Sequence, residues 1–534
     1  MEAISQDSVV SPGDISEAPI SMTTTDTNLT GSWKFFRPEP GQRFAPCAAA
    51  CPLQNQLPKI MQEILQDNWH KALQMLRQSN PLPAVTGRVC PGFCQQSCSR
   101  RHWDQEILAG CIERYLGDLG LEEPYPAAQE TRKERIAVLG SGPAGLGAAY
   151  FLARAGIRVT ILEKDKQPGG LLHQGIPAYR LPRDILDKEL HNLLQSLNIE
   201  LQLAQEITPE DIPALLQDYD YVFCAPGLGE SVLPAEYQDL KQEVLPGLEL
   251  LRSLNQGQVP AGKSFAVIGG GNVAVDAARS LLRCGKQVEI IYRRSFQEMP
   301  AYPEEKTQAL EEGIRLREKR LVSSASRKHD QLRVNLAQAV DKQGSIQPGE
   351  EAETLQVDQL VLAVGQKQHM QIPQEHRLFL GGDYPNGPGT VAQALASGRQ
   401  GAEKILEHIE PGLAREVCLC QEDLPVLESR QSGLEFVPVR PRLQVPELEV
   451  SRRTSGFQEI QGSLSQEEVL ESASRCLGCG SCNSCGLCWF FCPDVALSLE
   501  QGQPLPEIDL QHCKGCGLCA AVCPRGVIQM QEDL

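Results

Sequence analysis

Cysteines near the C-terminus form the clearest chemical pattern in this chain. Eight of them make two runs with the same C-x2-C-x2-C-x3-C-P spacing: Cys482, Cys485, Cys488 and Cys492, then Cys513, Cys516, Cys519 and Cys523. Thiolates at this spacing hold two iron–sulfur clusters, and the fourth cysteine of each run ligates the cluster of the other run. The pattern therefore predicts two one-electron centres, with ligands Cys482, Cys485, Cys488 and Cys523 for the first and Cys513, Cys516, Cys519 and Cys492 for the second.

A glycine-rich turn earlier in the chain predicts a dinucleotide site. It follows an apolar strand at 136–139, precedes an Ala- and Leu-rich helix, and reads Gly140-Ser141-Gly142-Pro143-Ala144-Gly145. Such a turn lets the backbone approach a pyrophosphate, which then faces the helix N-terminus. Glu163 ends the next strand, where a carboxylate accepts hydrogen bonds from a ribose.

A second turn of the same kind follows the strand at 265–268. It reads Gly269-Gly270-Gly271-Asn272-Val273-Ala274, and the next strand ends in Arg293 and Arg294. Arginine at that place suits the 2′-phosphate of NADPH. Glu289, within the same strand, is a counter-argument that favours NADH.

The length and the net charge of the chain exclude several classes of protein. A chain of 534 residues is too long for one core and divides into several domains. Its net charge of −18 argues against nucleic-acid binding, because phosphates attract a basic surface. No apolar run reaches the about 18 residues of a membrane span, and no basic-then-apolar leader opens the sequence. Most of the twenty cysteines are at metal-ligand spacings, which points to a reducing compartment, so we expect a cytoplasmic protein.

The two turns, the segment Gly169–Pro177 and Gly381-Gly382-Asp383 together resemble the small subunit of glutamate synthase and the N-terminal module of dihydropyrimidine dehydrogenase. The resemblance covers about residues 45–412. It implies that the first site holds FAD and that NAD(P)H delivers hydride to it. The FAD residues it implies, with those of the first turn, are Gly140, Gly142, Pro143, Ala144, Gly145, Glu163, Gly170, Leu171, Gly382, Asp383, Thr390 and Val391. For NAD(P) they are Gly269, Gly271, Asn272, Val273, Ala274, Arg293 and Arg294.

Five cysteines near the N-terminus match the iron–sulfur domain of the same family. Their spacing is C-x3-C followed by C-x3-C-x3-C: Cys47, Cys51, Cys90, Cys94 and Cys98. Zinc is the competing interpretation, since four thiolates also suit a tetrahedral structural site. In the relatives two clusters lie here and one takes a carboxylate or amide as its fourth ligand. Glu113 occupies the matching place, with Cys111 as the alternative.

The chain departs from its relatives in one respect. They carry a further C-x2-C upstream of the first C-x3-C, and nothing of that kind precedes Cys47. A C-x2-C motif occurs instead near the C-terminus, at Cys476-x2-Cys479. We hypothesise that this pair completes a first N-terminal cluster with Cys47 and Cys98, while Cys51, Cys90, Cys94 and Glu113 hold a second. The alternatives are that the pair has no metal or offers a slipped register for the C-terminal run.

These patterns predict an α/β protein with two Rossmann-like domains, the NAD(P) domain being inserted into the FAD domain. An α-helical iron–sulfur domain precedes them and a ferredoxin-like α+β domain follows. The expected regions are a disordered lead-in (1–45), the helical domain (46–128), the first FAD segment (129–260), the NAD(P) domain (261–364), the second FAD segment (365–412), a linker arm (413–472) and the ferredoxin-like domain (473–534).

The predicted function is electron transfer between NAD(P)H, FAD, four [4Fe-4S] clusters and a protein partner, in either direction. No side chain is expected to act as an acid–base catalyst, because the cofactors carry the hydride chemistry. The expected partner is a ferredoxin or a larger oxidoreductase such as a 2-oxoacid:ferredoxin oxidoreductase, within a hetero-oligomer. The alternatives are a glutamate synthase small subunit proper, an electron-bifurcating flavoprotein subunit, and a non-catalytic binding protein stabilised by metals.

Overall fold

The computed structural model describes residues 29–126, 130–234, 237, 244–329, 331–342, 345–418, 424–429, 432–499 and 505–533. The chain divides into two compact units. The larger unit is Ala45–Leu424 with Arg440–Cys476, and the smaller is Met1–Phe44, Pro425–Val439 and Leu477–Leu534. Among the described residues, no helix combines the length and the apolar character that a membrane crossing requires.

Short helices open the larger unit, in the region predicted as the helical domain. They are α1 Pro46–Ala50, α2 Leu57–Leu65, α3 Trp69–Ser79, α4 Pro83–Val89, α5 Phe93–Gln96 and α6 Ala109–Leu119. Two glycines let α4 and α6 cross at backbone contact. A Cβ on Gly87 would lie 2.3 Å from the Arg114 nitrogen, and one on Gly117 would lie 2.3 Å from the Ala84 nitrogen. This close crossing sets the end of α4, where Cys90 follows, against the helix that carries Glu113.

The first parallel sheet has the strand order β16-β5-β2-β3-β4. Its strands are β2 Arg135–Leu139, β3 Arg158–Leu162, β4 Glu200–Gln202, β5 Tyr221–Cys224 and β16 Leu378–Leu380. Helix α7 Pro143–Arg154 follows the first glycine turn, α9 is Arg183–Ser196, and α15 Val391–Ile409 packs on α7. The chain reverses its direction of strand addition between β2 and β5, which is where α/β sheets bind ligands at their carboxyl edge.

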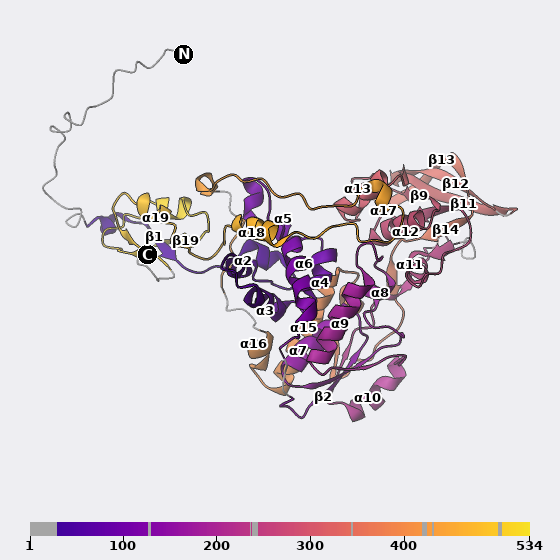
Figure 1. Cartoon of the computed structure of the whole chain (residues 1–534), viewed down its shortest axis with the longest axis horizontal. Helices are drawn as coiled ribbons and strands as arrows, with labels where there is room; N and C mark the ends of the chain where they lie inside the picture. Colours follow the sequence, from indigo (N-terminus) through magenta and orange to yellow (C-terminus); the bar gives the residue numbers. More distant parts are fainter. Residues whose placement is uncertain are drawn as a thin grey trace, which may run out of the picture. The chain divides into compact units, whose positions relative to one another are not determined.

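The second sheet has the order β10-β9-β8-β14-β7 and is also parallel. Its strands are β7 Val244–Pro246, β8 Ser264–Ile268, β9 Gln287–Tyr292, β10 Arg315–Glu318 and β14 Gln359–Leu362. Its helices are α11 Gly247–Asn255, α12 Asn272–Arg283 and α13 Pro303–Glu311. An antiparallel meander, β11 Arg320–Lys328, β12 Gln331–Lys342 and β13 Ser345–Val357, lies beside β9 (Figure 1).

The second sheet is inserted into the first domain, as the resemblance implied. The chain leaves at β6 Gly229–Ser231 and returns at β15 Gln366–Gln368, and these two strands pair with each other. The inserted domain begins earlier than the predicted residue 261, because β7 at Val244–Pro246 already belongs to its sheet. A three-residue edge strand carries no periodicity that a sequence could reveal.

Residues 440–476, here called the strap, belong to the larger unit and overlap the linker arm predicted for 413–472. The segment contains α17 Val450–Arg453 and α18 Gln466–Ser474, while α16 Leu413–Cys418 precedes it. Figure 1 shows α18 among the N-terminal helices, where Val469 and Ala473 are fully buried. Apolar side chains, Leu464, Val469 and Ala473 among them, pack on the helical core, and ion pairs of Arg453, Glu459 and Arg475 add to the attachment of the strap.

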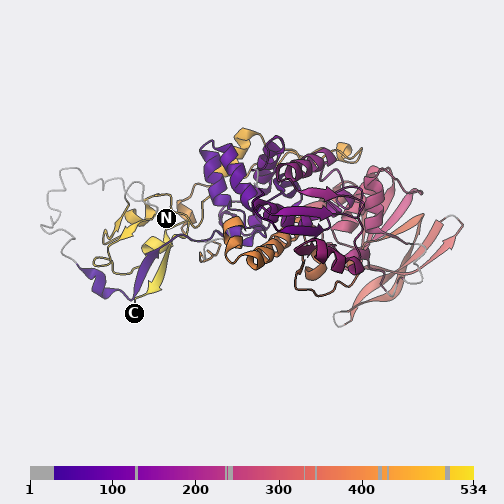
Figure 2. The ribbon, with the colours of Figure 1, turned by 90° about the horizontal axis from the view of Figure 1, so that it is seen from below.

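The smaller unit contains the C-terminal cysteine runs, with α19 Leu487–Phe490, α20 Leu518–Ala521, and the strand pair β17 Leu497–Ser498 and β18 Glu507–Ile508. It also contains β1 Phe36–Pro40, which pairs antiparallel with β19 Ile528–Glu532 (Figure 2). The prediction of a disordered lead-in is therefore wrong for residues 29–45, and residues 1–28 lie outside the described residues. A strand whose partner lies nearly the whole chain away leaves no local signal.

Candidate functional site: a dinucleotide cavity and four ligand sets

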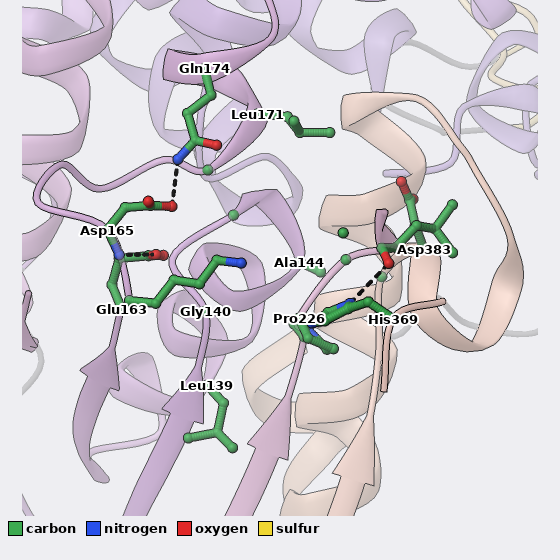
Figure 3. Close-up of a pocket in the computed structure, with 18 of the residues that line it drawn as sticks. Leu139, Gly140, Ala144, Glu163, Asp165, Leu171, Gln174, Pro226, His369 and Asp383 are labelled. Carbon is green, nitrogen blue, oxygen red and sulfur yellow. Dashed lines mark hydrogen bonds between the residues drawn. The ribbon is translucent and has the colours of Figure 1, made fainter. Parts of the chain in front are cut away.

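The predicted FAD residues converge on one cavity of about 1770 Å³ in the larger unit, counted with its open mouth. All of them except Gly145 line it: Gly140, Gly142, Pro143, Ala144, Glu163, Gly170, Leu171, Gly382, Asp383, Thr390 and Val391. In Figure 3, Gly140 and Ala144 lie between Glu163 on one side and Asp383 on the other. Gly145 serves the packing of α7 on the turn instead, since a Cβ there would lie 1.9 Å from the Gly140 oxygen.

Gly142 tests whether this cavity fits a dinucleotide. Its φ of −64° is open to any residue, and nothing in the protein lies within 4 Å of a Cβ placed on it. Neither backbone strain nor packing therefore requires glycine here. What glycine leaves is empty space directly at the N-terminus of α7, where a pyrophosphate would be stabilised by the helix N–H groups.

Glu163 braces the glycine turn as well as lining the cavity. The carboxylate is 4% exposed and accepts hydrogen bonds from the Ser141 nitrogen at 2.8 Å and from the Asp165 nitrogen at 2.9 Å. It also accepts one from the Ser141 hydroxyl at 2.5 Å. These bonds fix the carboxylate at the end of β3, where the sequence predicted a ribose partner.

Asp383 and the start of α15 form the other side of the cavity. Thr390 caps this helix: its hydroxyl accepts a hydrogen bond from the Gln393 nitrogen, and the Gln393 side chain accepts one from the Thr390 nitrogen. Burial raises the pKa of Asp383 to about 6, although the Gly389 N–H opposes that shift. The N-terminus of a 19-residue helix at a cavity wall favours negative charge or hydrogen-bond acceptors there.

Sequence reasoning missed several residues of this cavity. Figure 3 shows Asp165, Gln174 and His369 on its walls, and Arg252 of α11 lines it too. The His369 ring lies 2.9 Å from the Leu228 oxygen and packs against Gly229, where a Cβ would lie 2.3 Å from the ring. These residues come from the two crossovers and from the inserted domain, so no short motif contains them.

The second glycine turn has the same construction. Gly269, at φ +144°, holds a position where a Cβ would lie 2.3 Å from the Ala363 oxygen, whereas Gly271 has nothing within 4 Å. Asn272, Val273 and Ala274 begin α12, and the Asn272 side chain accepts a hydrogen bond from the Tyr302 nitrogen at 2.9 Å. Gly271 therefore leaves open space at a helix N-terminus, as Gly142 does.

Arg293 and Arg294 follow β9, with Arg293 exposed and Arg294 half-buried. Glu289, the residue that argued for NADH, is occupied elsewhere. Its carboxylate accepts from Arg317 at 2.7 Å and lies 3.7 Å from Arg315. The guanidinium groups at 293 and 294 thus remain the charged groups placed at the end of β9.

The second predicted N-terminal ligand set is brought together in the larger unit. Burial, and after it the nearby Glu113 carboxylate, raises the pKa of the Cys51 thiol to about 11 and that of Cys90 to about 12. Burial, Cys51, Glu113 and Cys90 likewise raise the pKa of Cys94 well above its usual range. Cys111 has other neighbours, Arg114, Glu304 and Arg442, and no thiol among them.

This set fits a metal centre on chemical grounds. Burial raises the pKa of Glu113 to about 7, and the groups that oppose the shift are the neutral polar side chains of Thr86, Asn55 and Asn80. Buried acidic groups are normally paired with a cation or bound to metal. Three thiols and a carboxylate crowded together without a cation therefore present a donor set that iron would neutralise.

Three of the four cysteines predicted for the first N-terminal cluster belong to the larger unit. Cys47, Cys98 and Cys476 pack against the same hydrophobic core, built from α2, α3, α6 and α18. Arg475, only 1% exposed, holds the chain in place just before Cys476. Its side chain donates to the Gln105 oxygen at 2.7 Å, and its backbone oxygen accepts from the Arg100 side chain at 2.8 Å. Cys479 belongs to the smaller unit.

The cysteines predicted to hold the C-terminal clusters lie near one another in the smaller unit. Cys488 interacts electrostatically with Cys482, Cys485 and Cys523, and these four thiols line a hollow of about 360 Å³, counted with its open side. Cys513 interacts with Cys492 and Cys516, and Cys519 with Cys513, Cys516 and Cys488. Within the described residues of the chain, no three His, Cys, Asp or Glu side chains converge as they would around a single metal ion.

Three families match this chain. Residues 134–385 match the pyridine nucleotide-disulphide oxidoreductases, and residues 43–124 match the 4Fe-4S cluster domain II of dihydropyrimidine dehydrogenase. Residues 506–529 match a 4Fe-4S binding domain. FAD, a pyridine nucleotide and [4Fe-4S] clusters are thereby confirmed as the cofactor classes, and the zinc interpretation of the N-terminal cysteines is overturned.

Curated relatives agree over most of the chain. The NADP(+)-dependent formate dehydrogenase subunit beta of Moorella thermoacetica is 31% identical over 511 residues, which cover 82% of this chain and 70% of that subunit. The NAD-dependent dihydropyrimidine dehydrogenase subunit PreT of Escherichia coli (strain K12) is 31% identical and covers 68% of this chain and 91% of PreT. The putative oxidoreductase YgfK of Escherichia coli O157:H7 is also 31% identical, and this chain spans 38% of its length.

The inserted-domain fold and the predicted resemblance are confirmed by these matches. Enzymatic oxidoreduction is confirmed with them, and two of the relatives are subunits by name. The chain belongs to the family of NAD(P)H-dependent flavin and iron–sulfur oxidoreductase subunits.

Proposed function

We propose that this subunit carries electrons from NAD(P)H at the second glycine turn to FAD in the cavity, then through the N-terminal ligand sets to the C-terminal ones and a protein partner. When bound, these groups supply hydride transfer and one-electron transfer. The chain's own residues bind and orient them. Each NAD(P)H oxidised leaves two electrons and one proton, so two one-electron acceptors are reduced per nucleotide.

The observation that carries this order is how the N-terminal thiols divide between two cores. Cys51 and Cys90 pack against the hydrophobic core of the first sheet, the one whose edge forms the FAD cavity. Cys47, Cys94, Cys98 and Cys476 pack against the core of the helical domain. The set of Cys51, Cys90, Cys94 and Glu113 therefore has thiols on both cores, and we place it as the first relay after the flavin, with the set containing Cys47 and Cys98 as the next.

An anaerobic titration tests this function. The purified, cluster-loaded protein should lose both its flavin and its iron–sulfur absorbance on addition of NADPH, and two electrons should be taken up per nucleotide. Flavin reduction without cluster reduction would contradict the relay. A full-length Cys90→Ser variant provides the sharper comparison, because flavin bleaching should survive in it while reduction of the remaining clusters slows strongly.

We further propose that Cys476 and Cys479 complete the set of Cys47 and Cys98. The placement of Cys476 on the same core as Cys47 and Cys98 supports this, and Cys479 is assigned on its spacing alone. Deleting 480–534 should remove two clusters and deleting 470–534 three, but the longer deletion also cuts α18.

A full-length Cys476→Ser/Cys479→Ser variant avoids that disturbance. It should lose about four iron atoms, one [4Fe-4S] cluster, relative to the unmodified protein. The half-buried Cys284, at the end of α12, provides the control, and Cys284→Ser should keep the full iron content. An unchanged iron content in the double variant would remove the pair from the ligand set.

The partner we propose is a ferredoxin or a larger oxidoreductase, with electron flow in either direction according to the potentials. Thiolate ligand sets in such number favour the reducing cytoplasm. Co-purification from the native host would identify the partner, and a protein that emerges alone at native abundance would count against the hetero-oligomer.

A further inference from the structure

The Glu113 side chain is held by two amides whose role the ligand spacing does not reveal. Asn55 Nδ2 lies 3.1 Å from one carboxylate oxygen, and Asn80 Nδ2 lies 3.1 Å from the other. Asn55 is 1% exposed and Asn80 is 0% exposed. Each oxygen of the carboxylate thus receives one buried N–H donor, and the two donors come from different segments, one after α1 and one after α3.

Asn80 has only one possible amide orientation. Its oxygen accepts a hydrogen bond from the Leu82 nitrogen at 3.1 Å, and its Nδ2 also donates to the Thr86 hydroxyl at 2.8 Å. That hydroxyl in turn donates to the Leu82 oxygen at 2.9 Å. Turning the amide over would set two donors against each other at Leu82, so the N–H must face Glu113.

Asn55 is held by a more adaptable partner. Its oxygen accepts from the Ser79 hydroxyl at 2.8 Å, and this hydroxyl also lies 3.4 Å from the Leu76 oxygen. A hydroxyl both donates and accepts, so Ser79 can reverse and allow the Asn55 amide to turn over. One amide is therefore fixed by the backbone and the other can follow a change at position 113.

We propose that Asn55 and Asn80 are positioning residues that hold Glu113 as the oxygen ligand beside Cys51, Cys90 and Cys94 and raise the reduction potential of the cluster bound there. This inference rests on the proposed ligand role of Glu113. A thiolate at position 113 would offer one weakly accepting sulfur in place of two carboxylate oxygens, so the two amide donors fit a carboxylate better. Hydrogen bonds to a ligand spread its negative charge and thereby favour the more negative, reduced cluster.

An EPR-monitored redox titration of the full-length, cluster-loaded protein tests the proposal. Asn55→Ala and Asn80→Ala should each lower the equilibrium constant for one-electron reduction of one cluster about tenfold, which is 59 mV. The EPR signal of that cluster should shift, while the other clusters and the flavin keep their potentials. Asn192→Ala is the matched control, because this half-buried asparagine donates to the Gly120 and Glu123 carbonyls and faces no ligand set.

Glu113→Gln provides a second measurement that does not depend on an alanine variant folding. The amide should be tolerated, because Asn80 can donate to its oxygen while Asn55 turns over to accept from its nitrogen. Ser79→Ala removes the partner that permits this reversal. The double variant Glu113→Gln/Ser79→Ala should therefore lose more of the cluster signal than the two single variants predict together.

Two outcomes separate this inference from the ligand assignment beneath it. If Glu113→Ala leaves every cluster signal unchanged, Glu113 is no ligand and both proposals fall. If Glu113→Ala alters one signal while Asn55→Ala and Asn80→Ala leave its equilibrium constant within about twofold, only the positioning role is overturned. Equal shifts in Asn192→Ala would likewise overturn it, since that variant removes hydrogen bonds to backbone carbonyls and none to a predicted ligand.

Discussion

Glycine serves two different purposes in each nucleotide turn. Gly140 and Gly269 adopt positive φ, at +93° and +144°, and a Cβ on either would collide with a backbone oxygen of the neighbouring strand end. Gly142 and Gly271 have ordinary φ values and empty space in front of them. The first pair is required by the fold of the turn, whereas the second pair is explained by room for a ligand.

Gly142→Val should therefore remove the flavin and spare the fold. The side chain fills open space at a permissive φ, so the free energy of unfolding should change by less than about 1 kcal/mol. Flavin content per chain should fall at least about tenfold, since a bulky side chain at this point blocks the pyrophosphate's approach to the backbone. Gly456, equally open and outside the cavity, gives the control: Gly456→Val should keep its flavin.

Arg293 and Arg294 set the choice of nucleotide if they bind a 2′-phosphate. Replacing both with alanine should raise the KM for NADPH about 10- to 100-fold and leave the KM for NADH within about threefold, because NADH lacks that phosphate. Steady-state kinetics with both nucleotides measures the split. Arg333, exposed on β12, is the control position, and a parallel loss for NADH would contradict the assignment.

At the scale of elements, the strap connects the helical domain and the inserted domain, two regions of the larger unit that separate sequence motifs identify. Its Glu459 lies 2.8 Å from Arg88 and 2.9 Å from Arg114, residues that flank Cys90 and Glu113 closely in sequence. Nearer the start of the strap, Arg453 pairs with Glu311 of the inserted domain. The strap therefore fastens the helical domain and the inserted domain, which limits how far the latter can rotate.

Glu459→Gln should destabilise the larger unit by about 3 kcal/mol, because the Arg88 and Arg114 side chains are only 3% and 6% exposed and would lose a charged partner. Chemical denaturation followed by near-ultraviolet circular dichroism measures this. Glu410 pairs with Arg132 while 59% exposed, so Glu410→Gln should cost less than about 1 kcal/mol. A similar decrease in the free energy of unfolding in both variants would show that burial of the arginine partners does not set the strength of these ion pairs.

At the scale of the whole molecule, the sequence predicted what is encoded locally. The two glycine turns could be predicted because each is a short motif between a strand and a helix, and the family resemblance implied the insertion of one sheet into another domain. The pairing of β1 with β19, the strap and the edge strand β7 could not be predicted, because each is stabilised by partners far away in sequence. Local composition carries no information about such partners.

Deleting residues 1–40 should weaken the smaller unit, because β19 would lose its neighbouring strand and Asp533 its pairing with Lys34 at 3.2 Å. We expect the C-terminal clusters to release iron to a chelator several-fold faster, while the flavin content stays the same. Deletion of residues 1–28, which keeps β1, is the matched control. Equal release from both truncated proteins would mean that the strand pair does not protect these clusters.

The pairing of β1 with β19 also has a consequence for biosynthesis. Between Pro40 and Ile528 the ribosome must add almost the entire chain, and at roughly 5–20 residues per second this takes roughly 25–100 s. β1 therefore leaves the ribosome long before β19 has been made. During that interval β1 is an unpaired edge, and the cysteines of the smaller unit can be brought under its cover only after β19 has been synthesised.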